Sequence, residues 1–573
     1  MSTDNPPTGE TGTEPGAAGT HEIVAVPAII DAVVDQEGDH WIRYGTEACA
    51  YWFTLRELVS DEKAVLARLA GTGKGILTTA SKNAFKKEVE RHKGYREALV
   101  AARPGWLGSP AVYVWGNGDV ERPAGDTREV IITFERNPKF DPVGTEQAWR
   151  AGLGPFVKNQ PIPLALIAYG FVGPILRFAP PHLQNPHVEI VGDRELAKTT
   201  WLVTVMAIFA GNPASDVGGA ETWDATINSH DLDKHAHADS LLARDEVNLA
   251  GTNTKDQGEV VRKAAFKGAT TGSRKRLTDL GPTSNVRLAM LSTSNVPQRD
   301  LVRGHAAEVD AVASRIVTIA VPKGHPHGVF GSVPVGYADA REAAEALRGA
   351  ADRNYGVAGR TFVRWLVAEA ARDEAGLRGR IEALMNRFLA AVREGGSATG
   401  GARCEKTLAA AYAAGELAGE AGVTRRDWGD PLPALLGVCH VPAAAAEDAE
   451  SAPAETSAYE QVRAYRARHR RDIARAKRLR RPYDEAAFAR KAGVLRRVGD
   501  RMELLIPAER FRAEFPNHRA LINQLKAEGR ARTEGGRQPK HTIKVPGRIC
   551  RATPRVYCVT VVDDVGPRRS SGM

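Results

Sequence analysis

The sequence lacks the features that would place a chain in a membrane or tie it together with disulfides. Its longest apolar run, residues 162–176, spans 15 residues interrupted by Pro and Gly, so it predicts a buried helix and not a bilayer span. The five cysteines include no CxxC pair, which argues against a zinc site or a disulfide framework. The polar N-terminus shows no signal-peptide pattern. We therefore expect a cytoplasmic protein with no membrane partner.

Charge is distributed unevenly along the chain. The net charge is +9, yet the residues from 461 onward carry 29 Lys and Arg against 11 Asp and Glu, and the rest of the chain is net negative. A basic segment attached to a neutral or acidic body is typical of proteins that bind nucleic acid at one end. The sequence therefore predicts DNA as a partner of the C-terminal part.

Composition and periodicity divide the 573 residues into several segments. Residues 141–336 alternate helix and strand like a parallel sheet covered on both faces, so the expected fold class is α/β. The expected strands of this sheet span 187–191, 240–247, 286–292 and 315–321. The other predicted segments are a disordered tail (1–22), an N-terminal α/β domain (23–140), an Ala-rich helical lid (337–440), a linker (441–458) and a basic C-terminal domain (459–573).

One strand-to-helix turn has the spacing of a phosphate-binding loop. The stretch "VEIVGDRELAKTT" (188–200) leads from an apolar strand into a helix, with Gly192 six residues before Lys198. Such a loop turns backbone N–H groups toward phosphate, supplies a Lys for the β- and γ-phosphates and offers a hydroxyl to Mg²⁺. The predicted nucleotide-binding residues are Gly192, Ala197, Lys198, Thr199 and Thr200. The alternative is an ordinary strand-to-helix turn.

Two later strands end in polar residues that such a loop requires. Asp245 and Glu246 follow an apolar strand 47 residues after Lys198, where a Mg²⁺-holding Asp and a water-activating Glu belong in ATPases of this plan. The next strand ends in the polar residues Thr293, Ser294 and Asn295, where a side chain can touch the γ-phosphate or the attacking water. We thus expect ATP as ligand, with Mg²⁺ held by Thr199 and Asp245. Solvated strand ends are the alternative.

Some residues complicate this interpretation. Ala197 stands where glycine is usual, and a positive φ there would cost about 1–2 kcal/mol. Glu195 brings negative charge into the loop, and Arg244 replaces an apolar residue beside Asp245. Arg315 opens the strand 315–321 and is either an arginine finger for a neighbouring subunit or a surface charge. A relative that no longer hydrolyses ATP therefore stays open as the second hypothesis.

Longer stretches carry a resemblance to a known family. Beside the loop, the segments "RPGWLGSPAVYVWGN" (103–117), "GTEQAWRAGLGPFV" (144–157), "GGAETWDATINS" (218–229) and "FKGATTGSRKR" (266–276) resemble the domain-of-unknown-function 927 family. Members of that family are carried mostly on phages and mobile elements and resemble MCM-type AAA+ helicases. The resemblance implies an AAA+-type nucleotide core and an ATP-driven oligomeric ring that moves on single-stranded or forked DNA. By this analogy Lys267, Arg274, Lys275 and Arg276 belong to a pore hairpin, the alternative being a solvated loop.

The basic C-terminal segment predicts a second DNA contact. Residues 459–497 carry basic side chains on almost every helical face, and the order strand, helix, turn, helix (517–528) and two-stranded wing predicts a winged helix. Such a module would mainly neutralise phosphates, so its binding should weaken steeply with salt. Packing within a ring is the alternative. The candidate contacts are Arg519, Asn523, Lys526, Arg530, Arg532, Arg537 and Lys540.

Overall fold

The chain folds into two compact units, Met1–Val441 and Pro442–Met573, and each is described by itself. The computed structural model describes residues 27–71, 76, 78–224, 229–251, 254–270, 286–302, 306–321, 325–395, 401–439, 458–499, 501–515, 518–532 and 541–561. The predicted tail 1–22 lies outside these residues, as does all but the last residue of the predicted linker 441–458.

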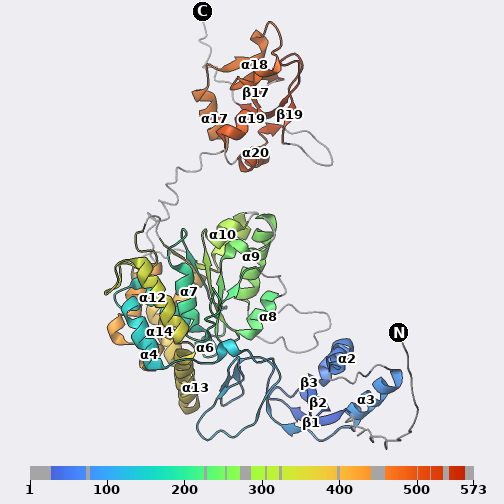
Figure 1. Ribbon diagram of the computed structural model, residues 1–573, viewed down its shortest axis with the longest axis vertical. Coiled ribbons are helices and arrows are strands. Elements are labelled where there is room, and N and C mark those ends of the chain that lie inside the picture. Colours follow the sequence, from blue (N-terminus) through green and yellow to red (C-terminus); the bar gives the residue numbers. More distant parts are fainter. Residues whose placement is uncertain are drawn as a thin grey trace, which may run out of the picture. The chain divides into compact units, whose positions relative to one another are not determined.

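Unit 1 begins with a small sheet in the order β3-β2-β1-β4, with helices packed against it (Figure 1). Alternating residues of its strands turn Ile42 and Phe53 inward, where they meet Val65 and Phe85 of the helices. Side-chain caps at Thr54, Asp61 and Thr78 fix where the helices begin. The elements are β1 (Ala28–Val34), β2 (His40–Thr46), β3 (Cys49–Thr54), α1 (Leu55–Ser60), α2 (Glu62–Ala70), α3 (Thr79–Arg91) and β4 (Arg96–Glu97).

Short strands connect this sheet to the main core of unit 1. β5 pairs with β9, and β6, β7 and β8 form a three-stranded antiparallel sheet. Trp106, Tyr113 and Trp115 from these strands are buried in the main core, and the Trp106 indole N–H donates to the Pro174 carbonyl at 2.8 Å. The elements are β5 (Leu99–Ala101), β6 (Gly105–Leu107), β7 (Val112–Val114), β8 (Val120–Glu121), β9 (Val130–Ile132) and the 3-10 turn η1 (Pro138–Phe140).

The centre of unit 1 is a five-stranded parallel sheet in the order β11-β12-β13-β10-β14. Its inner strands β10, β12 and β13 are buried along their whole length, as expected for strands covered on both faces. Figure 1 shows α7, α12 and α14 on one side of this sheet and α8, α9 and α10 on the other. The strands are β10 (His187–Val191), β11 (Glu221–Thr222), β12 (Leu241–Asp245), β13 (Ala289–Ser294) and β14 (Val317–Ala320).

Helices make up the remainder of unit 1. The apolar run 162–176 forms α5 and α6, both buried, as predicted from its composition. The Ala-rich segment after residue 337 forms long helices, and α14 packs its small residues against α5 and α13. The helices are α4 (Glu146–Val157), α5 (Pro161–Gly170), α6 (Val172–Ile175), α7 (Lys198–Met206), α8 (Ser229–Ala236), α9 (Thr254–Ala269), α10 (Gln298–Leu301), α11 (Ala306–Ala313), α12 (Ala340–Arg353), α13 (Val357–Glu394), α14 (Gly401–Glu420) and α15 (Pro431–Cys439).

Unit 2 is a mixed α/β unit with its own apolar core. Its sheet has the order β15-β16-β17-β20-β18, and β19 also pairs with β20. The basic run 459–497 is not one continuous helix, because α17 ends at Arg468 and the chain then forms β15, the short helix α18 and β16. The elements are α17 (Ala458–Arg468), β15 (Ile473–Arg475), the 3-10 turn η4 (Ala476–Arg478), α18 (Glu485–Ala489), β16 (Gly493–Val498), β17 (Arg501–Pro507), α19 (Ala508–Glu514), α20 (His518–Ala527), β18 (Ala531–Arg532), β19 (Ile543–Lys544) and β20 (Arg555–Val561).

Candidate functional site

The loop between β10 and α7 opens onto a hollow at the carboxyl edge of the central sheet. The hollow has a volume of about 250 Å³. In open α/β sheets, ligands bind outside the carboxyl ends of the strands, and a helix N-terminus there favours anions. Residues from the loop and from the ends of β12 and β13 meet at this place. The lining residues are Arg194, Glu195, Lys198, Thr199, Asp245, Glu246, Asn248, Thr293, Ser294 and Asn295.

Lys198 holds the loop and the end of β13 together. Its buried ammonium donates to the carbonyl of Gly192 at 2.8 Å, to the carbonyl of Asp193 at 2.5 Å and to the Asn295 side-chain oxygen at 3.3 Å. Burial lowers the pKa of Lys198, while the neighbouring carboxylates oppose that shift. The ammonium is therefore fixed at the mouth of the hollow.

A carboxylate and two hydroxyls converge beside Lys198. The Thr199 hydroxyl lies 3.1 Å from both carboxylate oxygens of Asp245. The Thr293 hydroxyl donates to the same carboxylate and accepts the backbone N–H of Glu246 at 3.0 Å. Carboxylate and hydroxyl oxygens suit a hard cation such as Mg²⁺. Thr199 and Asp245 thus fit a magnesium site.

Three residues of the loop and of the turn after β12 adopt left-handed backbone without being glycine. Ala197 precedes α7 with φ +60° and ψ +21°, Glu195 has φ +63° and Glu246 has φ +56°. Such conformations are strained for residues with a Cβ, and they cluster at functional sites. At Glu246 the turn takes the exposed side chain out of the buried strand β12 and into the lining of the hollow.

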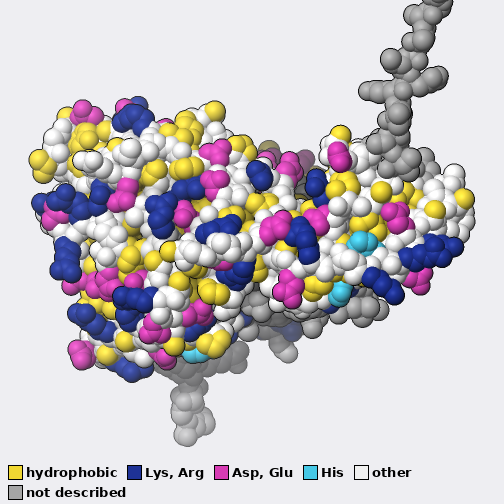
Figure 2. Space-filling model, turned by 90° about the horizontal axis from the view of Figure 1, so that it is seen from below, with side chains coloured by type: hydrophobic (Ala, Val, Ile, Leu, Met, Phe, Trp, Pro, Cys, Tyr) yellow, Lys and Arg dark blue, Asp and Glu magenta, His cyan; other side chains and the backbone are white. Residues whose placement is uncertain are grey.

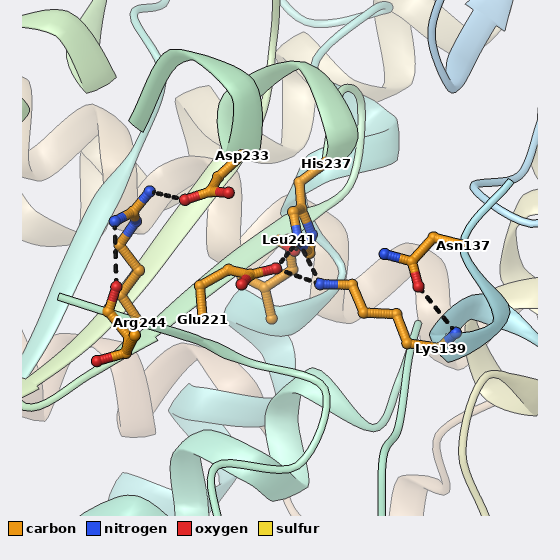
Figure 3. A network of polar contacts seen from close by, with 8 residues as sticks. Asn137, Lys139, Glu221, Asp233, His237, Leu241 and Arg244 are labelled. Atoms are coloured by element: carbon orange, nitrogen blue, oxygen red, sulfur yellow. Dashed lines mark hydrogen bonds and ion pairs between the residues drawn. The ribbon is translucent and has the colours of Figure 1, made fainter. Parts of the chain in front are cut away.

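Arg244 does not enter this hollow. Successive side chains of a strand point to opposite faces, so Arg244 and Asp245 diverge. The buried guanidinium of Arg244 pairs with Asp233 of α8 (Figure 3). It also lies over the Trp223 ring. The same view shows His237 beside Lys139 and Glu221, with Lys139 Nζ 3.0 Å from His237 Nε2. Asp233 therefore neutralises the charge of Arg244 at a place away from the loop, and this charge does not enter the hollow.

Two other predicted site residues lie elsewhere. Thr200 lines a second hollow of about 700 Å³ with Ala197 and His327. Arg315 precedes β14 and therefore lies at the amino edge of the parallel sheet, opposite the loop. Its guanidinium covers the Phe266 ring at 4.2 Å and donates to the Ala311 carbonyl. A role of Arg315 on a neighbouring subunit stays a prediction.

The predicted DNA contacts differ in how far their charges are already paired. Lys267 pairs with Asp231 at 2.8 Å, and Arg530 covers the Tyr459 ring at 3.8 Å. Arg532 lies 3.5 Å from Glu503. Asn523 and Lys526 are exposed on α20, which also carries Arg519. The predictions for Arg274, Lys275, Arg276, Arg537 and Lys540 fall outside the described residues.

Sequence reasoning missed two residues of the hollow, Arg194 and Asn248. Arg194 lies inside the loop, and this position in the sequence could have indicated that it lines the hollow. Asn248 follows Glu246 in the 3-10 turn η2 (Val247–Leu249). The left-handed backbone at Glu246 brings Asn248 to the hollow, and periodicity does not reveal such a turn.

Comparisons with known proteins complete the description of the chain. A solved structure named "SCCmec type IV Cch - active helicase" is similar with a TM-score of 0.47 and 15% identity, covering 93% of each chain. A search of curated proteins gave no match. Among the described residues, no helix combines the length and apolar character needed to cross a membrane. Residues 3–283 match the model of the family described as "Domain of unknown function (DUF927)", the family that the sequence motifs indicated. This segment is therefore similar to the DUF927 family, while residues 284–573 lie outside the matched range.

Proposed function

We propose that the chain is an ATP-driven motor that moves on DNA, an MCM-like helicase or translocase that serves replication of a mobile element. The observation that carries the proposal is the convergence of Lys198, Thr199, Asp245 and Asn295 at one hollow. These side chains come from the start of α7 and from the ends of the adjacent strands β12 and β13, and each has the chemistry that a nucleoside triphosphate requires at that place. The ring assembly rests on the family resemblance alone.

Each residue at the hollow has a distinct role in the proposal. Lys198 and the backbone N–H groups at the start of α7 bind the β- and γ-phosphates. Thr199 and Asp245 hold Mg²⁺, which when bound neutralises the charge that develops on the phosphates. Glu246 accepts a proton from the attacking water, and Asn295 orients that water.

The decisive experiment measures ATP turnover by the full chain with and without DNA. Lys198→Ala should lower turnover by about 100-fold or more, because it removes the charge at the phosphate site. Lys158→Ala, an exposed lysine of unit 1, is the matched control and should change little. Equal turnover in the wild type and in Lys198→Ala would contradict the proposal.

The left-handed backbone of Ala197 favours a second candidate function, that of a structural module that binds DNA or a partner without hydrolysing ATP. Its φ of +60° strains the loop, as expected for a relative that has lost hydrolysis and binds DNA or a partner structurally. In that case the natural chain would show no turnover, and Ala197→Gly would restore it.

A further inference from the structure

A basic strip in unit 2 lies on a segment of the chain other than helix α20. We define the strip as the cationic residues of the segment 470–481, which contains Asp472 as its one acidic residue. All of these cationic side chains are exposed. The members of the strip are Arg470, Arg471, Arg475, Lys477, Arg478, Arg480 and Arg481.

Apolar neighbours hold the strip in place. Ile473 is buried in one core of unit 2, and Ala474, Ala476 and Leu479 pack against a second core. The segment is also tied to the sheet, because β15 pairs in parallel with β16 from Ile473↔Gly493 to Arg475↔Leu495. The backbone is therefore ordered by packing, while the cationic side chains between these anchors face solvent.

The cations of the strip form no ion pair with the described residues. Two acidic residues elsewhere in unit 2 are engaged with other arginines, since Glu503 pairs with Arg496 and Arg532, and Glu514 pairs with Arg468. Exposed like charges repel one another, so seven cations against one acid at an ordered edge need an external anion. On the face of the molecule drawn in Figure 2, by contrast, Lys and Arg are interspersed with Asp and Glu.

We infer that the basic strip binds the phosphate backbone of double-stranded DNA without reading its sequence. The segment 470–481 contains no aromatic residue, so it offers no platform on which the bases of a single strand could stack. It also contains no Asn or Gln to read base edges, whereas arginine and lysine neutralise phosphates regardless of sequence. This inference rests on the DNA-binding part of the proposed function and moves the main contact from α20 to the strip.

The test is the salt dependence of DNA binding by the full chain in the absence of nucleotide. Anisotropy of a labelled 20-base-pair duplex is recorded between 50 and 300 mM KCl for the wild type and for a strip variant, Lys477→Ala/Arg478→Ala/Arg480→Ala/Arg481→Ala. Each phosphate that the variant no longer neutralises should reduce the slope of log K against log salt by about 0.9. Removal of all four cations reduces the slope by up to about 4 and the affinity at low salt by more than about tenfold.

Matched variants keep the test independent of net charge and folding. The charge control removes four exposed but paired arginines of unit 1 (Arg341, Arg364, Arg372 and Arg425) and should leave the slope unchanged. Replacing Arg478, Arg480 and Arg481 by lysine, with Lys477 unchanged, keeps the charge and should retain binding. An unchanged melting temperature of the alanine variant shows that its loss of binding is not a loss of fold.

Several outcomes would overturn the inference. Duplex binding equal to wild type in the strip variant would do so, and so would a loss confined to Asn523→Ala/Lys526→Ala on α20. Tighter strip-dependent binding to a single strand, or to vesicles with anionic headgroups, would assign the strip to another partner. Because the assay needs no ATP, Lys198→Ala should bind the duplex normally. Absence of turnover would therefore disprove the proposed motor and leave the strip assignment standing.

Discussion

Positive charge is arranged in opposite ways at the loop between β10 and α7 in unit 1 and at the basic strip of unit 2. Lys198 is buried and bound by three oxygens, whereas the strip cations are exposed and form no ion pair among the described residues. A buried, fixed charge can act on one atom of one ligand, and it is little affected by salt. Exposed, unpaired charges bind any phosphate backbone and weaken with salt. The comparison teaches that a cation that is buried and hydrogen-bonded helps to form a defined binding site. A cation that is exposed and unpaired is suited instead to attracting a charged polymer.

The largest expected effect tests whether a buried ion pair in unit 1 stabilises the fold more than an exposed ion pair does. Asp233→Ala leaves the buried guanidinium of Arg244 without its carboxylate, which should lower the free energy of unfolding by about 3 kcal/mol. Glu345→Ala removes an exposed partner of Arg341 and should cost about 0.5 kcal/mol or less. Urea unfolding of both variants measures the difference. Equal losses of unfolding free energy in the two variants would contradict this expectation, because burial would then not affect how much an ion pair stabilises the protein.

The second effect concerns Glu189, a buried acid on β10, the strand that leads into the loop. Glu189 of β10 accepts the Thr318 hydroxyl at 2.7 Å and the Gln298 backbone N–H at 3.0 Å, and burial raises its pKa to about 7. In the unfolded chain this group ionises near its ordinary pKa of 4.5, so the unfolded state releases the proton first. The wild type therefore loses stability as pH rises from about 4.5 to 7, and the loss is complete above that range.

Glu189→Gln removes this titration. The stability of the variant relative to wild type should increase between pH 5 and pH 8, by an amount on the order of 3 kcal/mol. Thermal or urea unfolding across that range provides the measurement. His187 on the same strand, with a pKa that burial lowers to about 3, titrates in both proteins and cancels in the difference. A difference that does not change with pH would mean that Glu189 is not a buried acid of this kind.

The sequence predicted which residues meet at the hollow better than it predicted the strip, for a physical reason. Asp245 and Asn295 stand at the ends of two apolar strands, and Lys198 opens the helix that follows a third. The carboxyl ends of parallel strands meet at one edge of the sheet. Strand alternation also indicates that Arg244 points away from Asp245. In the run 459–497, by contrast, helical spacing continued past Arg468, and only the pairing of β15 with β16 converts that stretch into an edge strand. The backbone φ of Ala197 likewise depends on tertiary structure.

A smaller effect is expected where the loop is strained. Ala197→Gly removes about 1–2 kcal/mol of left-handed strain. The greater freedom of glycine in the unfolded chain offsets roughly 0.5–1 kcal/mol of that gain. The variant should therefore be more stable by up to about 1 kcal/mol, and its ATP turnover should rise. Ala346→Gly inside α12 should instead destabilise by about 1 kcal/mol, and melting temperatures compare the two.

The smallest stability effect is expected at the basic strip, where a single charge has no ion-pair partner among the described residues. Arg478→Ala should change the free energy of unfolding by no more than about 0.5 kcal/mol, because its side chain is exposed and unpaired in that part of the chain. The same substitution should reduce the salt slope of duplex binding by about 1. A variant that binds less DNA at unchanged stability would show that Arg478 contributes to DNA binding and not to the stability of unit 2. A loss of stability as large as that of Asp233→Ala would instead show that Arg478 helps hold unit 2 together, and the contrast between the two regions would fail.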